Sequence, residues 1–110
     1  MSEELRAPQC SAEEIAAALK LLEGRWKLMI VYSLFAQPVM RFSELERANP
    51  GISQKMLTQQ LRELERVGIV VRQVYPEVPP KVEYSLTEHG KALYPVLDEL
   101  MKWARGSYAL

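Results

Sequence analysis

Residues 53–68, SQKMLTQQLRELERVG, are the segment that most restricts how this chain can fold. Their large apolar residues recur at intervals of three and four, which predicts a helix with one apolar face. Ser53 is of a type that caps helix starts, and Gly68 suits the left-handed conformation that ends helices. At about 100° per residue, the core-facing side is expected to hold Leu57, Leu61 and Leu64, with Met56, Gln60 and Val67 beside them.

The opposite face of this predicted helix carries basic and amide side chains, and both acids of its second half fall at the margins. A DNA major groove requires this chemistry, because cations bind phosphates while amide and guanidinium groups bond base edges. For the helix taken alone, a solvated amphipathic surface is the alternative. The centre of the face consists of Lys55, Thr58, Gln59, Arg62 and Arg66, and the margins hold Glu63 and Glu65.

The segments on either side favour the DNA-binding interpretation. Residues 42–48 predict a short helix, which the strong turn signal Asn-Pro-Gly at 49–51 ends. Residues 69–75 and 81–86 are rich in β-branched or alternating residues and predict a hairpin whose tip is PEVPP. This order predicts a helix-turn-helix over 42–67 followed by a wing over 69–86.

Further helices are expected outside this unit. The capping-box spacing of Ser11 and Glu14 begins a helix over 11–23, and residues 26–35 are apolar on most sides, as in a central helix. Residues 39–41 are long enough only for a single edge strand. A last helix is expected over 88–105, bent at Pro95. The predicted fold is mainly α with a β-hairpin wing (α+β): a single winged helix-turn-helix domain over 1–110, with 1–10 as an N-terminal arm.

Composition excludes several function classes. The 110 residues have a formal net charge of zero, so any case for nucleic acid depends on where the charges lie. One Cys and one His cannot assemble a structural zinc site, and no nucleophile has an evident base, so neither a metal, a cofactor nor an enzyme is expected. There is no apolar run of about 18 residues and no signal-peptide pattern, so a cytoplasmic protein is expected.

Three stretches together resemble the HxlR family of bacterial winged helix-turn-helix transcription regulators. They cover about four fifths of the chain in order, and the most specific parts are ISQKMLTQQLREL and VYPEVPPKVEYSLT. The matching stretches are GRWKLMIVYSL at 24–34, RFSELERANPGISQKMLTQQLRELERVGIVVRQVYPEVPPKVEYSLTEHG at 41–90, and LYPVLDELMKWA at 93–104.

The resemblance implies a homodimeric DNA-binding repressor or activator whose terminal helices, 11–23 and 88–105, make most of the dimer contact. The last helix carries an apolar stripe too wide for one small core, which agrees with a subunit contact. The implied interface residues are Leu93, Val96, Leu97, Leu100, Met101 and Trp103. The implied DNA-binding residues are Arg41 and Ser43 before and in the short helix, Ser53, Gln54, Lys55, Thr58, Gln59 and Arg62 in the recognition helix, and Pro79, Pro80 and Lys81 in the wing.

Cys10 has two interpretations, a thiol sensor and a small packing residue. It precedes the predicted first helix, where the partial positive charge of a helix N-terminus lowers a thiol's pKa, and some family members look like thiol sensors at this position. Glu14 lies in the same turn and acts in the opposite direction. Members commonly have Cys-Pro where this chain has Cys10-Ser11, so a sensor and a small packing residue both stay open.

Two functions of different classes follow. The first is a sequence-specific homodimeric regulator on an inverted-repeat operator, its two recognition helices about 34 Å apart, responsive to a thiol-reactive signal, an oxidant or a small ligand. The alternative is a winged-helix protein-interaction module without base-specific DNA binding. An interaction surface would show exposed apolar anchors on the helix over 53–67, where this sequence has polar side chains.

Overall fold

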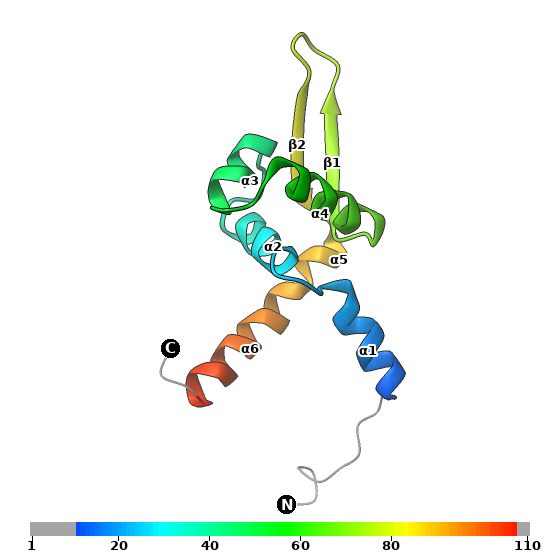
Figure 1. The fold of residues 1–110 in the computed structure, drawn as a ribbon, viewed down its shortest axis with the longest axis vertical. Coiled ribbons are helices and arrows are strands. Elements are labelled where there is room, and N and C mark those ends of the chain that lie inside the picture. Colours follow the sequence, from blue (N-terminus) through cyan, green and yellow to red (C-terminus); the bar gives the residue numbers. More distant parts are fainter. Residues whose placement is uncertain (1–10, 108–110) are drawn as a thin grey trace, which may run out of the picture.

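The computed structural model describes residues 11–107. A helical body carries a long hairpin at one end, and the first and last helices diverge from the other end (Figure 1). The elements in chain order are α1 (Ala12–Leu21), α2 (Lys27–Ala36), α3 (Phe42–Ala48), α4 (Gln54–Arg66), β1 (Val70–Tyr75), β2 (Lys81–Leu86), α5 (Glu88–Lys91) and α6 (Leu93–Ser107). This is the winged helix-turn-helix that the sequence predicts.

Helix α4 forms as its pattern predicts. Ser53 accepts a hydrogen bond from the Met56 backbone N–H at 3.0 Å, which satisfies one of the free donors at the helix start. Gly68 adopts a φ of 79°, the left-handed conformation that glycine takes without steric cost. The three leucines of its apolar face, Leu57, Leu61 and Leu64, are buried as predicted. Met56 is exposed instead of core-facing, since it lies in the first turn at the edge of that face.

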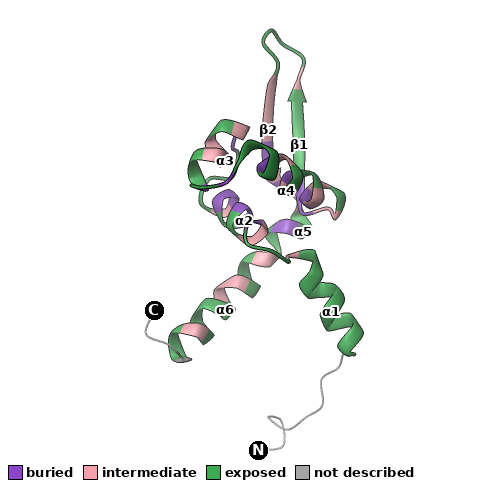
Figure 2. Ribbon diagram, viewed as in Figure 1, coloured by how far each residue is buried: buried purple, intermediate pink, exposed green. Residues whose placement is uncertain are grey.

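The core lies between α2, α3, α4 and the base of the hairpin. Ile30, Val31 and Leu34 of α2 pack with Leu45 of α3 and the α4 leucines. Trp26, just before α2, belongs to the same core. Figure 2 shows that buried residues gather in this body and at the start of the wing, while α1 and the outer part of α6 are exposed.

The wing is a two-stranded antiparallel hairpin that is anchored at its base. Its register runs from Val70 opposite Leu86 to Tyr75 opposite Lys81. The predicted edge strand at 39–41 is reduced to one bridge, in which the Met40 N–H donates to the Tyr84 carbonyl at 3.0 Å and the Tyr84 N–H donates to the Met40 carbonyl at 2.8 Å. This bridge ties the entrance of α3 to β2.

The last helix differs from the expectation of one bent helix over 88–105. The chain forms a short α5 that ends at Lys91, and α6 begins at Leu93; Ala92 between them keeps right-handed helical dihedrals. Pro95 is the physical reason, because its ring nitrogen cannot donate to the Lys91 carbonyl and its ring would clash with that carbonyl in a continuous helix. The break therefore lies one turn before the proline.

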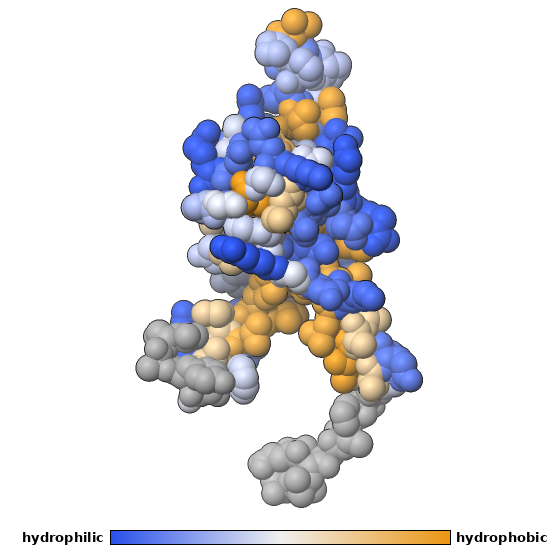
Figure 3. All heavy atoms as spheres, viewed as in Figure 1, coloured by the Kyte–Doolittle hydropathy of each residue, from blue (hydrophilic) through white to orange (hydrophobic). Residues whose placement is uncertain are grey.

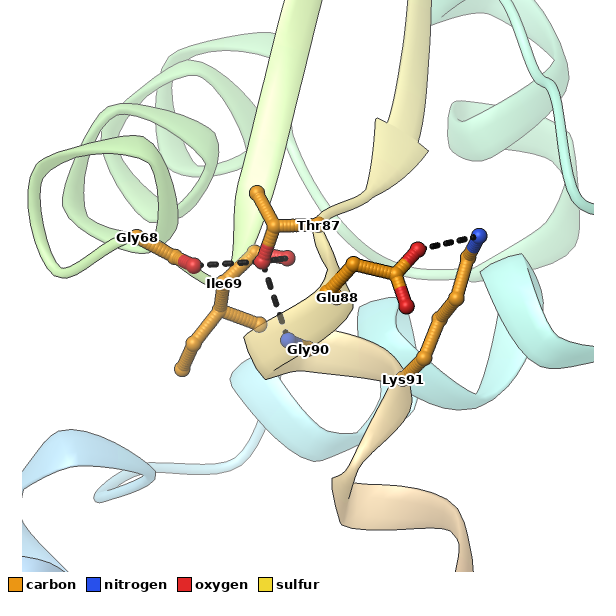
Figure 4. A network of polar contacts seen from close by, with 6 residues as sticks. All are labelled: Gly68, Ile69, Thr87, Glu88, Gly90 and Lys91. Carbon is orange, nitrogen blue, oxygen red and sulfur yellow. Dashed lines mark hydrogen bonds and ion pairs between the residues drawn. The ribbon is translucent and has the colours of Figure 1, made fainter.

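A polar network fixes where this last part of the chain leaves the body (Figure 4). The Thr87 hydroxyl donates to the carbonyls of Gly68 and Ile69, the latter at 3.2 Å, and accepts from the Gly90 N–H at 2.9 Å. The Thr87 N–H also donates to the Ile69 carbonyl at 3.0 Å. Thr87 thus caps α5 and holds it against the junction between α4 and β1.

Candidate nucleic-acid interface

The polar face of α4 is open to solvent. Its side chains stand on a helix whose opposite face is held by three buried leucines, so their directions are set by the core. Thr58 is half-buried, and its hydroxyl donates to the Gln54 carbonyl at 2.8 Å, which leaves its methyl group and oxygen lone pairs for a ligand. The exposed members are Ser53, Gln54, Lys55, Gln59 and Arg62.

Arg66 is exposed but is not a free cation of this face. Its Nη2 lies 2.8 Å from Glu63 Oε1 and its Nε lies 3.3 Å from Glu63 Oε2, a two-point contact one turn apart on the helix. The hydrogen bond from Arg66, reinforced by its charge, lowers the pKa of the Glu63 carboxyl. Both groups lie near the end of α4, so the open cations of the helix are Lys55 and Arg62.

The start of α3 presents two further predicted residues. Arg41 is exposed at the N-cap position, where its backbone N–H donates to Glu44 Oε1 at 2.7 Å. Ser43 is exposed in the first turn. Both precede the turn that leads into α4, so they lie in the same helix-turn-helix as the α4 residues.

The wing places its predicted residues at its far end. Pro79 and Pro80 are exposed in the tip, whereas Lys81 is partly occupied: its Nζ lies 3.9 Å from Glu83 and 4.4 Å from the centre of the Tyr75 ring. The neighbouring Glu83 carboxylate raises the pKa of the Tyr75 hydroxyl. The described part of the tip, residues 76–80, carries no basic side chain.

The charged residues Arg72, Lys81 and Glu83 of the wing do not pair across its two strands, although charges on a hairpin commonly do so. Lys81 and Glu83 both belong to β2, and Arg72 reaches out of the sheet, with its Nε 3.6 Å from Glu65 Oε1 on α4. The cause is the register, which sets Arg72 opposite Tyr84 and turns its side chain toward the helix. Sequence patterns do not contain this contact, because it joins two elements whose relative position only packing decides.

The opposite end of the molecule exposes apolar surface. Among the interface residues predicted in the last helix, Leu93 and Leu97 are partly buried against the core. The other four are exposed, with Leu100 at 49% and Trp103 at 63%: Val96, Leu100, Met101 and Trp103. Figure 3 shows hydrophobic residues on both diverging helices, in contrast to the hydrophilic body.

Helix α1 adds apolar residues that the sequence analysis did not single out for this surface. No residue of Ala12–Leu21 is buried, and Leu19 is 68% exposed. The signal was present in the helical spacing of Ile15 and Leu19, but that spacing is equally typical of a helix that packs on its own core. Only the fold shows that the body does not cover them.

The remaining expectations concern Cys10 with the N-terminal arm, metal binding and membrane spans. Cys10 and the arm at 1–10 lie outside the described residues. Within residues 11–107, no group of three or more His, Cys, Asp or Glu side chains is placed to hold a metal ion. In the same part of the chain, every helix is too short or too polar to span a membrane.

Comparison with known proteins agrees with this geometry. The HxlR-like helix-turn-helix family matches residues 21–109. The helix-turn-helix-type transcriptional regulator YkvN of Bacillus subtilis is 52% identical over 90 residues, which are 82% of this chain and 75% of YkvN.

Two solved structures superpose well on this fold. The redox regulator HypR in its reduced form has a TM-score of 0.77 at 45% identity, covering 84% of this chain and 91% of HypR. The reduced form of the transcriptional regulator YodB from B. subtilis has a TM-score of 0.78 at 44% identity, covering 86% and 92%. With a match over most of its length and a winged helix whose recognition face is open, this chain belongs to the HxlR-like helix-turn-helix family and is a DNA-binding transcription regulator, not an enzyme.

Proposed function

We propose that the protein works as a homodimer that reads an inverted-repeat DNA sequence through α4. The observation that carries the proposal is the placement of two unlike surfaces at opposite ends of one body. The polar face of α4 and the wing lie at one end, and the apolar faces of α1 and α6 extend from the other. Two copies joined by their α1 and α6 helices would each keep a recognition helix free.

The roles of the α4 side chains follow from their chemistry. Arg62 presents a guanidinium fork that suits the O6 and N7 atoms of guanine, and Gln59 presents an amide that suits the N6 and N7 atoms of adenine. Lys55 is a compact point charge near the helix start and suits a phosphate. Arg41 and Ser43 at the start of α3, and Pro79, Pro80 and Lys81 in the wing, would contact the backbone beside the groove.

The apolar ends support the dimer. Large apolar side chains are exposed on both α1 and α6, and large exposed apolar patches commonly mark interaction sites. Two-fold symmetry of the protein would match two-fold symmetry of the DNA site, with recognition helices about one helical turn, or 34 Å, apart. The dimer contact would involve Ile15 and Leu19 as well as Val96, Leu100, Met101 and Trp103.

A fluorescence-anisotropy titration tests the function directly. A labelled duplex from the region upstream of the gene, and a scrambled duplex of the same composition, are titrated at several salt concentrations. We expect tighter binding to the upstream duplex at every salt concentration, and a linear fall of log K with log salt. Equal binding of both duplexes would instead support the protein-interaction module without base reading.

A thiol response extends this proposal. The chain has one cysteine, Cys10, directly before the residue that caps α1, and its relative HypR is described as a redox regulator. In a dimer joined through α1, modification of the two thiols would alter the contact that sets the spacing of the recognition helices. Diamide treatment followed by DNA titration tests this: we expect parent protein to lose affinity and Cys10→Ser to retain it. Equal loss in both proteins would rule the thiol out.

A further inference from the structure

A polar notch lies between the recognition helix and the wing. It has a volume of about 230 Å³, and both elements contribute its walls. Leu61 and Tyr84 are buried at its base, whereas the remaining lining side chains carry charge or a hydroxyl group. The lining residues are Thr58, Leu61, Arg62, Glu65, Arg72 and Tyr84.

The notch brings together two guanidinium groups from distant parts of the chain. Arg62 stands on α4 and Arg72 on β1, and one carboxylate, Glu65, faces them. Burial raises the pKa of the Tyr84 hydroxyl, the Glu65 charge adds to this, and the Arg72 and Arg62 charges oppose it. All three charged groups therefore act on the same buried ring, and the notch carries a net positive charge of one when they are ionised.

The pair between Glu65 and Arg72 is loose. The 3.6 Å between Arg72 Nε and Glu65 Oε1 exceeds an N–H···O hydrogen bond, and the two side chains are 49% and 29% exposed for Arg72 and Glu65 respectively. An ion pair of this kind in water contributes little to stability, so another anion can replace the carboxylate at small cost. The guanidinium fork of Arg72 matches the two free oxygens of a phosphodiester.

We propose that the notch receives one phosphate of the DNA backbone, which Arg72 binds. Before DNA binds, Glu65 holds the Arg72 side chain in position, and the phosphate then takes the place of the Glu65 carboxylate. This deepens the proposed function and rests on it. With α4 in the major groove, as proposed, the DNA backbone at the groove edge would pass beside α4, where the notch opens toward the wing. The Thr58 hydroxyl already donates to the Gln54 carbonyl, and the proposed function assigns Arg62 to a base edge, which leaves Arg72 to donate to the phosphate.

The salt dependence of DNA binding tests the contact. Replacing Arg72 by glutamine should weaken binding to all duplexes alike and reduce the slope of log K against log salt by about one unit, as for one lost phosphate contact. Glu65→Gln should act in the opposite direction, with tighter binding at low salt, because it removes the competing carboxylate. Lys91→Gln is the control: it also deletes one cation from an ion pair, with Glu88 on α5, and should change neither quantity.

A scan with neutral phosphates identifies the contact on the DNA. A series of duplexes carries one methylphosphonate each, and both the parent and Arg72→Gln are titrated against all of them. We expect one position per half-site at which the methylphosphonate weakens DNA binding by the parent but does not change binding by Arg72→Gln. If parent and variant respond alike at every position, or share one salt slope, Arg72 binds no phosphate and the inference falls.

A free phosphate ion has the same chemistry as a phosphate of the DNA backbone and could occupy the notch in its place. Binding of inorganic phosphate to the free protein is therefore compared between the parent and Arg72→Gln, beside their DNA affinities. Phosphate binding that Arg72→Gln loses, with DNA affinity and salt slope equal to the parent's, would reassign the notch to a free anion and overturn the inference. A parent that binds no duplex at all would contradict the proposed function itself, which keeps the two failures apart.

Discussion

Gly90 lies directly against the backbone carbonyl of Ile69, so closely that a β-carbon on Gly90 would overlap the carbonyl oxygen. This contact, together with the hydrogen bonds of Thr87, presses α5 onto the junction between α4 and β1 (Figure 4). Helix α6 continues from α5 after a single break at Ala92. The direction of the apolar C-terminal helix is thus set by a contact with the segment that joins the recognition helix to the wing.

Substitution of Gly90 by alanine should destabilise the protein. The new methyl group meets the Ile69 carbonyl and lies 3.2 Å from a methyl carbon of Leu86, so the backbone must move. We expect a loss of about 1–3 kcal/mol in the free energy of unfolding, as for other overpacked sites, measured by urea denaturation. Gly106→Ala is the matched control: it lies in α6 with nothing within 4 Å, and should be neutral or slightly stabilising. Equal effects of the two substitutions would contradict the close packing at Gly90.

The stability of the protein should depend on the hydroxyl group of Thr87 and not only on the size of its side chain. Thr87→Val keeps the shape but removes the cap of α5 and the hydrogen bonds to the Gly68 and Ile69 carbonyls. A loss of about 0.5–2 kcal/mol is expected, the range for a missing N-cap. Thr87→Ser retains the hydroxyl and should recover most of this difference in the same denaturation experiment. If serine and valine are equally harmful, the network does not carry the stability.

Base reading should be separable from phosphate binding on α4. Arg62→Ala or Gln59→Ala should each cost about 1–3 kcal/mol of binding free energy and relax the preference at one base-pair position. Lys55→Ala should weaken all sequences alike and lower the salt slope by about one unit. Titration of duplexes with single base-pair changes checks this. Unaltered preference at every position in both Arg62→Ala and Gln59→Ala would mean that α4 does not read bases through them.

The exposed apolar face of α6 should control the oligomeric state. Leu100→Glu places a charge in the proposed subunit contact, where it would lose water without a partner. We expect a dimeric parent and a monomeric variant in sedimentation-velocity experiments at micromolar concentration, together with weaker DNA binding. Val78→Glu is the control for sedimentation alone, because that valine is 100% exposed in the wing tip, away from α6, but next to the proposed DNA contacts of Pro79 and Pro80. A parent that sediments as a monomer would refute the dimer.

The elements that could be predicted are those whose signals are local. The capping box of Ser11 and Glu14 forms as expected, with contacts of 2.8 Å and 3.2 Å. The leucine spacing of α4 and the alternation of β2 each specify one buried face, which one chain segment determines by itself. The break at Ala92 was missed because a proline in a helical pattern indicates a disturbance but not whether the helix bends or divides.

The sequence by itself determined the order of elements, the buried face of α4 and the kinds of side chain on its open face, because periodicity and capping act within one or two helical turns. Tertiary structure alone decided that Arg72 reaches Glu65, that Gly90 meets Ile69, and that Ile15 and Leu19 of α1 are left uncovered by the body. These relationships join residues from different elements, or depend on where the core ends. They follow from how the elements pack together, and local patterns carry no record of that packing.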